Sequence, residues 1–378
     1  MIKTMLVFGT RPEAIKMCPL VLELKKHKNI KTVVVVTGQH REMQEEVMKV
    51  FGVEPDYNME IMEKNQSLYD ITTKVLNGMK PILENEKPDC VLVQGDTTSA
   101  MAVAMASFYQ RIPVGHIEAG LRTYNIYAPY PEEFNRQAIS SVSRYHFAPT
   151  KEAQDNLLRE GKNSDCVFVT GNTVIDAMKY TVSDKYANPE FDWVGNDRLV
   201  FITAHRRENI GEPMRRMFRA VRRVIEEHED VKALYPVHPN PQVRKIAFKE
   251  FAGCEKIHLI DPLDVIACHN FESRCFLCLT DSGGIQEECP SFGKPVLVMR
   301  DVTERNEGIS AGALMLVGTD ENKIYDAFSL LLDNKDEYQK MAKVTNPYGD
   351  GHACERIAEI LEDRLEKDSC SYSGQSRF

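Results

Sequence analysis

Three carboxylates in the first half of the chain have a placement that suits proton transfer. Asp96, Glu118 and Glu132 each lie at the end of an apolar or turn segment. Side chains at the carboxyl ends of parallel strands can converge, and burial beside another carboxylate raises a carboxyl pKa toward neutrality. We therefore predict general acid and base chemistry for this group. Taken singly, each carboxylate is more typical of a helix cap or a surface ion pair.

The second half of the chain supplies groups that suit an anion. His205-Arg206-Arg207 follows an apolar run, and imidazole and guanidinium both donate hydrogen bonds to phosphate. The turn Ser282-Gly283-Gly284 also follows an apolar run and opens a helix-like stretch, where free backbone N–H groups attract phosphate. A plain helix N-cap has the same pattern. One helical turn further on, Glu287 or Glu288 is placed to bind a ribose diol.

The chain lacks the common cofactor motifs. No G-x-G-x-x-G follows the first apolar run and no G-x-x-x-x-G-K-[ST] occurs, which disfavours NAD and a P-loop nucleotide site. Metal-ligating residue types gather at His116-x-Glu118 and at Cys268-His269 with Cys275-x-x-Cys278. The second group lacks another paired C-x-x-C and its later cysteines fall in a strand pattern. We predict no metal site and no cofactor.

Short apolar runs alternating with amphipathic stretches must position these side chains. The runs Thr4–Gly9, Val33–Thr37 and Cys90–Gly95 read as buried strands separated by helices, which is typical of a parallel sheet covered on both faces. The pattern restarts after about residue 170 with Leu199–Thr203, and 378 residues exceed what one core usually holds. We predict an α/β fold with two doubly wound domains and a cleft between them.

Composition excludes several classes of protein. The net charge is −9, from 47 basic and 56 acidic residues, which disfavours a nucleic-acid partner. The apolar stretches are too short to span a membrane, and no signal-peptide pattern opens the chain, so we expect a cytoplasmic protein without a membrane partner. The ten cysteines lie mostly among apolar residues, and we expect reduced, packed thiols.

Several long motifs together resemble the non-hydrolysing UDP-N-acetylglucosamine 2-epimerase family. The resemblance runs from residue 1 to about residue 365, and Pro262–Ile266 looks most like the Gram-positive-type branch. The motifs that carry it are Phe8–Lys16, Gly95–Thr98, His116–Arg122, Pro131–Glu133, Val169–Thr173, Thr203–Asn209, Asp281–Glu288 and Asn346–Gly351.

The resemblance implies a reaction as well as a fold. The family interconverts UDP-GlcNAc and UDP-ManNAc without NAD or metal, by anti elimination of UDP to 2-acetamidoglucal and re-addition with the proton delivered from the other face. It implies a GT-B-like fold of two Rossmann-like domains whose final helix returns to the first domain, and a homodimer. The product would supply ManNAc units for surface polysaccharide. We expect domain limits of 1–171 with helix 352–367, then 172–351, and a disordered tail at 368–378.

The resemblance also implies roles residue by residue. Asp96, Glu118 and Glu132 are then the acid and base candidates, and which serves which face stays open. His205 steadies charge that develops on the diphosphate. The expected substrate-binding residues are Arg11 and Lys16 beside the acids, Ser282, Gly283 and Gly284 on phosphate, Glu288 on ribose and Arg305 on the nucleotide.

Members of the Gram-positive-type branch also bind a second UDP-GlcNAc as an activator. Gln39, Arg206 and His238 match that pattern, together with Glu132. Glu42 stands where glutamine is usual and Asn65 where arginine is usual, and both changes disfavour a diphosphate ligand. We expect this allosteric site to be weakened. Further departures from the family pattern are Gln94, Pro239, Asn306 and Cys268, the last at a position where an aromatic ring would stack on the base.

Three other readings are open from the sequence. A nucleotide-sugar-dependent glycosyltransferase of the same fold would transfer sugar without hydrogen exchange at C2. A hydrolysing epimerase would release free ManNAc, but the chain has no kinase domain that would support it. A non-catalytic nucleotide-sugar sensor is disfavoured, because a sensor needs no acid and base groups.

Overall fold

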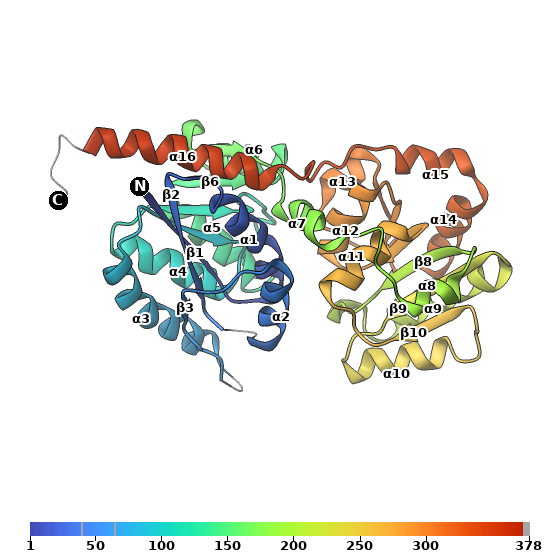
Figure 1. Ribbon diagram of the computed structural model, residues 1–378. Helices are drawn as coiled ribbons and strands as arrows, with labels where there is room; N and C mark the ends of the chain where they lie inside the picture. The colour runs from blue at the N-terminus through green and yellow to red at the C-terminus, as the bar shows by residue number, and fades with distance from the viewer. Residues whose placement is uncertain (39–40, 64–65, 373–378) are drawn as a thin grey trace. The chain divides into compact units, whose positions relative to one another are not determined.

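The computed structural model describes residues 1–38, 41–63 and 66–372, with the backbone alone at 41–43 and 368–372 (Figure 1). It divides into two compact units, Met1–Tyr180 with Tyr348–Phe378, and Thr181–Pro347. Each unit has its own parallel sheet and its own apolar core. The predicted α/β class with two doubly wound Rossmann-like domains is confirmed.

The first unit is built on a seven-stranded parallel sheet in the order β3-β2-β1-β4-β5-β6-β7. Buried β-branched and aliphatic residues form its central strands, as the continuous apolar runs predict. The strands are β1 Ile2–Phe8, β2 Ile30–Val36, β3 Tyr57–Asn58, β4 Cys90–Gln94, β5 Val114–Ile117, β6 Tyr145–Ala148 and β7 Val167–Val169. The helices are α1 Arg11–Leu24, α2 Arg41–Phe51, α3 Leu68–Glu86, α4 Thr98–Tyr109, α5 Glu132–Val142, α6 Lys151–Arg159, α7 Thr173–Thr181 and α16 Ala353–Tyr372, with the 3₁₀ turn η1 Ser164–Cys166.

The second unit repeats the design with six parallel strands in the order β10-β9-β8-β11-β12-β13. Its core lies on both faces of β8 and β11. The strands are β8 Arg198–Thr203, β9 Val231–Pro236, β10 Ile257–Ile260, β11 Leu277–Thr280, β12 Val296–Val298 and β13 Leu314–Leu316. The helices are α8 Pro189–Val194, α9 Glu212–Glu227, α10 Pro241–Glu250, α11 Val265–Arg274, α12 Gly283–Glu288, α13 Asn306–Ala311, α14 Glu321–Asp333 and α15 Lys335–Ala342, with η2 Arg207–Asn209 and η3 Cys289–Phe292.

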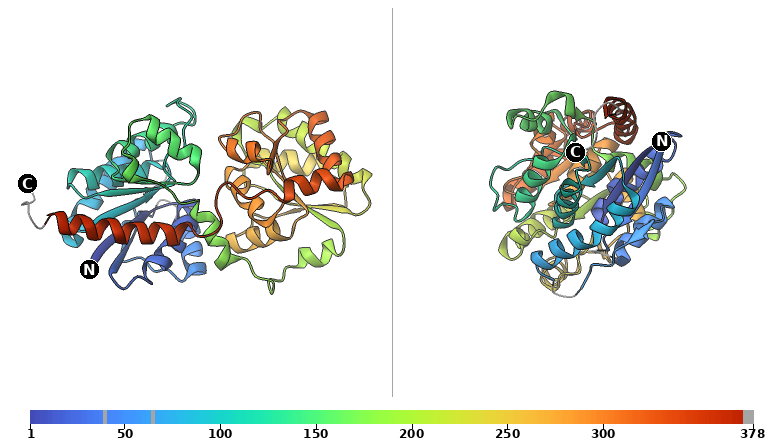
Figure 2. Two further views of the ribbon diagram at one scale, coloured as in Figure 1. Left: turned by 90° about the horizontal axis from the view of Figure 1, so that it is seen from above. Right: turned by 90° about the vertical axis from the view of Figure 1, so that its left-hand side faces the viewer.

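The C-terminal helix α16 packs on the first unit beside α1, as Figures 1 and 2 show. Ile357, Leu361 and Leu365 are buried along its inner face, which confirms the predicted return of the final helix. The helix continues to Tyr372, whereas the sequence leads us to expect a disordered tail from residue 368. No glycine or proline occurs before Gly374 to end the helix earlier. Residues 373–378 lie outside the described part of the chain.

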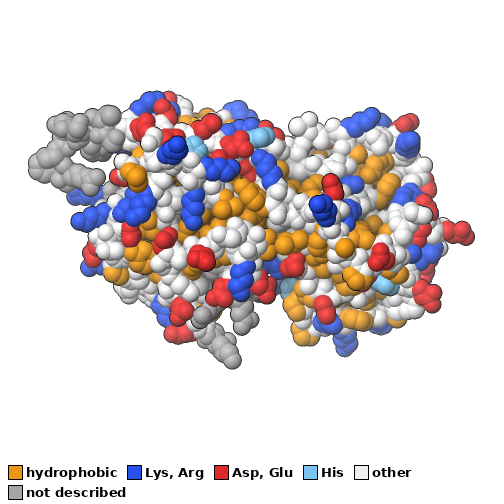
Figure 3. Space-filling model, viewed as in Figure 1, with side chains coloured by type: hydrophobic (Ala, Val, Ile, Leu, Met, Phe, Trp, Pro, Cys, Tyr) orange, Lys and Arg blue, Asp and Glu red, His pale blue; other side chains and the backbone are white. Residues whose placement is uncertain are grey.

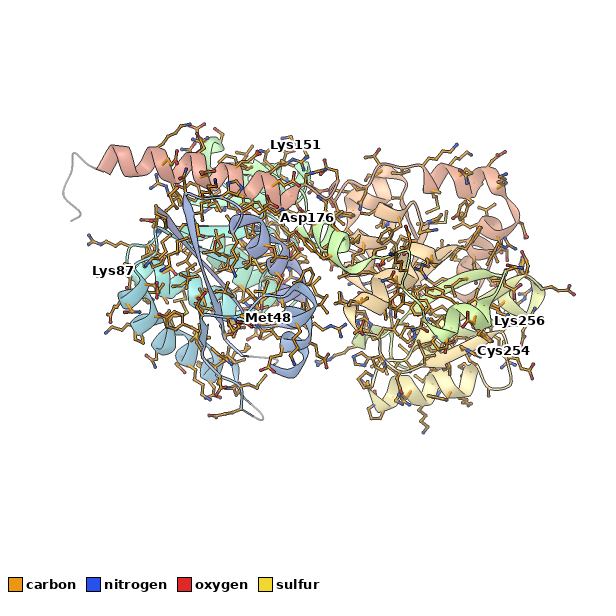
Figure 4. All side chains as sticks on the ribbon, in the orientation of Figure 1. Met48, Lys87, Lys151, Asp176, Cys254 and Lys256 are labelled. Carbon is orange, nitrogen blue, oxygen red and sulfur yellow. The ribbon has the colours of Figure 1, made fainter. Side chains whose placement is uncertain are left out.

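The two units divide at residues 180 and 347, whereas the sequence places the divisions at 171 and 351. Helix α7 belongs to the first unit because it holds the start of α16. The Asp176 carboxylate accepts hydrogen bonds from the first two backbone N–H groups of α16, at 3.1 and 2.9 Å. Figure 4 shows Asp176 at this junction. The Asn172 N–H donates to the Tyr348 carbonyl oxygen at 2.7 Å, just ahead of the helix.

Charged side chains of both signs are interspersed on the face shown in Figure 3. The nine cysteines whose side chains are described are all free thiols, as expected. Among the described helices, we find none that combines the length and the apolar character needed to cross a bilayer.

Two buried histidines on neighbouring strands make the first unit sensitive to acid. His116 on β5 and His146 on β6 are paired in register, and the Nδ1 atom of each has no hydrogen-bond partner among the described residues. Burial lowers the pKa of His116 to about 4 and that of His146 to about 3. Because these values lie below the unfolded pKa of about 6.5, the unfolded chain binds protons first as the pH falls. Stability is therefore lost below pH 6.5.

The wild type loses stability between pH 7.5 and pH 4.5, and we expect His146→Gln to make this loss smaller by about 2 kcal/mol. Urea unfolding followed by circular dichroism at the two pH values measures this loss. His352→Gln is the control, because His352 is half exposed and pairs with Glu355 on the surface. An unchanged loss in His146→Gln would show that other groups cause the acid sensitivity.

Candidate active site

In each unit, candidate residues follow the strands at which the strand order reverses, and in the first unit Glu118 follows the next strand, β5. In the first sheet the order reverses between β1 and β4, and in the second between β8 and β11. Loops that leave the carboxyl ends of the two strands at such a point diverge to opposite faces and leave room for a ligand. The predicted residues Lys16, Asp96 and Glu118 follow strands of the first sheet, and His205 and Ser282 follow strands of the second.

The loop after β1 is closed by a capping box. The Glu13 carboxylate accepts hydrogen bonds from the N–H groups of Gly9 and Thr10 at 2.9 and 2.8 Å. Its other oxygen accepts from the Thr97 hydroxyl at 2.7 Å, directly after Asp96. This contact ties the start of α1, where Arg11 is the first residue, to the loop after β4. The pattern Thr-x-x-Glu ahead of a helix is a signal that sequence reasoning could have used.

Glu118 is held in one orientation by donors from three other segments. Lys16 Nζ lies 2.7 and 2.8 Å from its two carboxylate oxygens, and Asn172 Nδ2 donates to it at 3.2 Å. The Gln94 side-chain amide donates to the same carboxylate. The Glu118 backbone has a φ of +63°, a conformation that non-glycine residues rarely adopt and that clusters at functional sites. The predicted residues Lys16 and Glu118 thus form one buried ion pair.

Asp96 has the carboxyl group best suited to proton transfer near neutral pH. Burial raises its pKa to about 6, and the negative charges of Glu118 and Glu132 act in the same direction. Arg136 opposes the rise, with Nη2 3.3 Å from the carboxylate, and Lys16 opposes it too. The Asp96 side chain keeps 32% of its surface exposed, so a ligand can reach it. The structure therefore couples the three predicted carboxylates electrostatically.

Helix α5 positions Glu132 and the partners of Asp96. Glu132 is its first residue, and the buried Glu133 accepts hydrogen bonds from two backbone N–H groups of the preceding loop at 3.0 Å. Asn135 Nδ2 donates to the Asp96 carbonyl oxygen at 2.9 Å. Arg136 Nε lies 3.3 Å from Glu133. Sequence reasoning missed Asn135 and Arg136, although the Glu-x-x-Arg spacing from Glu133 was visible.

In the second unit, Asp281 fastens the loop after β8 to the end of β11. Its fully buried carboxylate accepts hydrogen bonds from the backbone N–H groups of His205 and Arg206 at 3.0 and 2.9 Å. Asn209 Nδ2 adds a third donor at 3.0 Å. Asp281 belongs to the motif Asp281–Glu288, but no role for it was predicted from the sequence. Its signal was an acidic residue at the end of a buried strand.

His205 presents a half-exposed imidazole beside a second histidine. Its ring stacks on that of His238, with centroids 5.3 Å apart and an interplanar angle of 17°. Burial lowers the pKa of His205, although the negative charge of Asp281 opposes this shift. The imidazole is therefore neutral above its ordinary pKa and can donate one N–H. Arg206, predicted with His238 for an allosteric site, lies in the same loop, and its Nε donates to the Asp281 carbonyl oxygen at 3.3 Å.

The remaining predicted residue of the allosteric site is Gln39, and Glu42 and Asn65 are the two positions that depart from the family pattern there. Gln39 and Asn65 lie outside the described residues. Glu42 lies in α2, where only its backbone is described. That prediction is therefore neither supported nor opposed by the structure.

The Ser282-Gly283-Gly284 turn opens helix α12, as predicted, and its two glycines make room for charged groups. A Cβ atom at Gly283 would lie 3.1 Å from Cζ of Arg305. A Cβ atom at Gly284 would lie 3.2 Å from Oε1 of Glu288. Arg305 is fixed by Glu287, with Nε 3.0 Å from its carboxylate. Glu287 is thus engaged by an arginine, and the Glu288 carboxylate is the one that lies against the turn.

The residue groups that the sequence analysis considered and rejected as metal ligands have other contacts in the structure. His116 Nε2 lies 2.7 Å from the Gly95 carbonyl oxygen. Cys275 and Cys278 are buried in the core around β11. Among the described residues, one group of three side chains has potential ligand atoms within 4.8 Å of one another, and it consists of His269, Glu272 and Glu288. Sequence reasoning did not include Glu272.

Comparison with known proteins decides the family. The family model described as UDP-N-acetylglucosamine 2-epimerase matches residues 22–362. A UDP-N-acetylglucosamine 2-epimerase from Bacillus subtilis strain 168 is 55% identical over 360 residues, covering 95% of each chain. The chain belongs to the UDP-N-acetylglucosamine 2-epimerase family. The prediction of an isomerase of this family is therefore confirmed.

Solved structures agree with this epimerase assignment. A crystal structure from Listeria monocytogenes is 50% identical and superposes with a TM-score of 0.92, covering 97% of each chain. The UDP-GlcNAc 2-epimerase from Neisseria meningitidis, solved bound to UDP-GlcNAc, is 45% identical with a TM-score of 0.88. The match covers 96% of this chain and 100% of the Neisseria chain. The match thus extends over both units of the epimerase fold.

Proposed function

We propose that this chain catalyses the reversible conversion of UDP-GlcNAc to UDP-ManNAc by inversion at C2 of the hexose, without metal or NAD. One observation carries the proposal. Burial and the negative charges of Glu118 and Glu132 raise the pKa of Asp96 to about 6. The chain that carries this carboxyl group belongs to a family named for 2-epimerisation. A carboxyl group with such a pKa exchanges protons readily near neutral pH.

The proposed reaction proceeds by elimination and re-addition. A carboxylate removes the proton from C2, the C2–H electron pair becomes the C1–C2 double bond, and the C1–O bond breaks with its electrons leaving on UDP. The products of this step are 2-acetamidoglucal and UDP. In re-addition the UDP oxygen attacks C1 while an acid delivers a proton to the other face of C2. The sequence of steps consumes no oxidant, reductant or water.

We assign the two proton transfers to the group formed by Asp96, Glu118 and Glu132. Inversion requires one residue that can transfer a proton on each face of C2. The three carboxyl groups of the first unit are enough to supply both. Support comes from the contacts that hold them. Lys16 fixes the Glu118 carboxylate, and Arg136 lies 3.3 Å from Asp96. Such preorganisation reduces the reorganisation that proton transfer would otherwise require.

We assign the departing UDP to groups of the second unit. The neutral imidazole of His205 would donate an N–H to the diphosphate, where charge develops as the C1–O bond breaks. The Ser282-Gly283-Gly284 turn would bind phosphate through its backbone N–H groups, and Arg305 beside Gly283 would add a positive charge. Glu288 would accept hydrogen bonds from the ribose hydroxyls. Support for these assignments comes from the close approach of Arg305 to Gly283 and of Glu288 to Gly284, which only residues without a Cβ atom allow.

The wider setting of the reaction follows the family resemblance. We infer that the enzyme works in the cytoplasm as a homodimer and that UDP-ManNAc is consumed in surface polysaccharide synthesis. The protein would need no partner beyond its nucleotide sugars and a second copy of itself.

The decisive experiment is incubation with UDP-GlcNAc in heavy water, followed by proton NMR. We expect UDP-ManNAc to appear with deuterium at C2, and deuterium to enter C2 of the remaining UDP-GlcNAc as well. A glycosyltransferase would leave the C2 hydrogen in place and need an acceptor. Absence of deuterium at C2 while UDP-ManNAc forms would refute elimination, and absence of UDP-ManNAc would refute the epimerase assignment.

A further inference from the structure

The second unit contains a buried carboxyl group that the proposed reaction leaves unused. Glu272 on α11 is fully buried. Its Oε1 accepts a hydrogen bond from the Cys268 thiol at 3.1 Å, whereas Oε2 has no hydrogen-bond partner among the described residues. An unpaired ionised carboxylate in this position would be strongly unfavourable, because burial removes its hydration. The group therefore needs either a proton or a bound cation.

The neighbours of Glu272 connect it to the predicted ribose ligand. His269 and Glu288 have ligand-type atoms within 4.8 Å of its carboxyl group, and His269 Nε2 lies 3.7 Å from Oε2 of Glu288. The other ring nitrogen of His269 lies 2.7 Å from the Thr181 hydroxyl, which fixes the ring. Oε1 of Glu288 faces Gly284. The Glu288 carboxylate thus lies between the turn on one side and the Glu272–His269 pair on the other.

Burial and the charge of Glu288 both favour a proton on Glu272. Burial raises the pKa of Glu272 well above its usual value, and the negative charge of Glu288 adds to this. Thiols also interact with it, at Cys268, Cys275, Cys278 and Cys289. Burial also raises the pKa values of Cys275, Cys278 and Cys289, which keeps these thiols neutral at pH 7. A protonated Glu272 can donate its O–H to the Glu288 carboxylate, which gives Oε2 of Glu272 a hydrogen-bond partner.

We propose that Glu272 and His269 are positioning residues that hold the Glu288 carboxylate against the Ser282-Gly283-Gly284 turn, where it binds the ribose hydroxyls of the nucleotide sugar. The inference rests on the proposed function, because that function supplies the ligand. Glu272 touches neither the sugar nor the diphosphate. Its loss therefore changes the affinity for the nucleotide and leaves the chemical step unchanged.

The test compares Glu272→Met with Glu272→Gln. Methionine fills a similar volume without a donor, whereas glutamine keeps an N–H that can donate to Glu288 and an oxygen that can accept from the Cys268 thiol. We expect Glu272→Met to raise the KM for UDP-GlcNAc about tenfold, the scale of a lost hydrogen bond to a charged group, with kcat within about twofold. Glu272→Gln should have a KM near the wild-type value. Glu226→Met, on the surface of α9, is the matched control.

The pH dependence adds a measurement that a purely structural role would not change. Below its pKa Glu272 is neutral and donates to Glu288, and above its pKa the two carboxylates repel. The wild-type KM should therefore rise at high pH, whereas Glu272→Gln, which cannot ionise, should lack this rise. Equal KM values in wild type and Glu272→Met, or a Glu272→Gln variant as impaired as Glu272→Met, would overturn the proposal.

Two further readouts separate the alternatives. Dialysis of the wild type against EDTA should leave KM unchanged, and an increase that Mn²⁺ or Zn²⁺ reverses would replace the proposal with a cation site. Calorimetry with UDP alone measures nucleotide affinity without turnover. Weaker UDP binding in Glu272→Met, in a protein without epimerase activity, would support the positioning role while the proposed function fails. Unchanged UDP binding in an active epimerase would overturn the positioning role alone.

Discussion

Asp96→Asn is expected to slow deuterium entry at C2 of UDP-GlcNAc by about a thousandfold, the scale of lost general acid–base catalysis. Asparagine matches aspartate in size, but its amide can neither take nor release a proton near neutral pH. The backbone carbonyl of residue 96 keeps its hydrogen bond from Asn135. Binding of UDP should therefore stay within a fewfold of the wild type. Proton NMR in heavy water measures the exchange, and calorimetry measures the binding.

The control for this substitution is Asp155→Asn, the same chemical change on α6. The Asp155 side chain is 48% exposed and pairs with Lys151 on the surface, where the loss of an ion pair has little effect. Its exchange rate should equal that of the wild type. If Asp96→Asn also exchanges at the wild-type rate, Asp96 takes no part in proton transfer. The raised pKa of Asp96 then no longer supports the proposed function.

The strands that carry the site were predictable from the sequence because they are buried on both faces. Cys90–Gln94 is a nearly continuous apolar run and Val114–Ile117 is a weaker one, and both are buried at every position. The polar residues that follow them had to emerge at the carboxyl edge of the sheet. Asp96 and Glu118 could therefore be selected from their positions alone. The same reasoning placed His205 after β8 and the glycine turn after β11.

The partners of these residues could not be predicted, because they come from distant parts of the chain. Asn172 contacts Glu118 across 54 residues of sequence. Arg136 on α5 contacts Asp96 although α4 and β5 lie between them in the sequence. The positive φ of Glu118 could not be predicted either, because a glutamate in the sequence does not indicate this backbone conformation. Glu272 was missed for a related reason. A single acidic residue in an amphipathic helix normally faces solvent, and only tertiary packing turned this one toward the core.

Asp281→Asn is expected to lower the free energy of unfolding of the second unit by about 2–4 kcal/mol. The buried carboxylate accepts hydrogen bonds from the backbone N–H groups of His205 and Arg206 and from Asn209. Asparagine offers one acceptor oxygen, and its NH₂ group would face the remaining donors. At least one buried donor is then left unpaired. The loop that presents His205 also loses its attachment to β11, so UDP affinity should fall together with stability.

Trp193 makes this effect measurable, because it is the single tryptophan of the chain and lies in the second unit. Its fluorescence during urea unfolding reports the unit that Asp281 stabilises. Asp261→Asn is the matched control, since the Asp261 side chain is 91% exposed and pairs with Arg244, and its effect should stay below about 0.5 kcal/mol. An unfolding midpoint for Asp281→Asn equal to that of the control would mean that contacts other than this carboxylate hold the loop after β8. The placement of His205 would then need a different physical explanation.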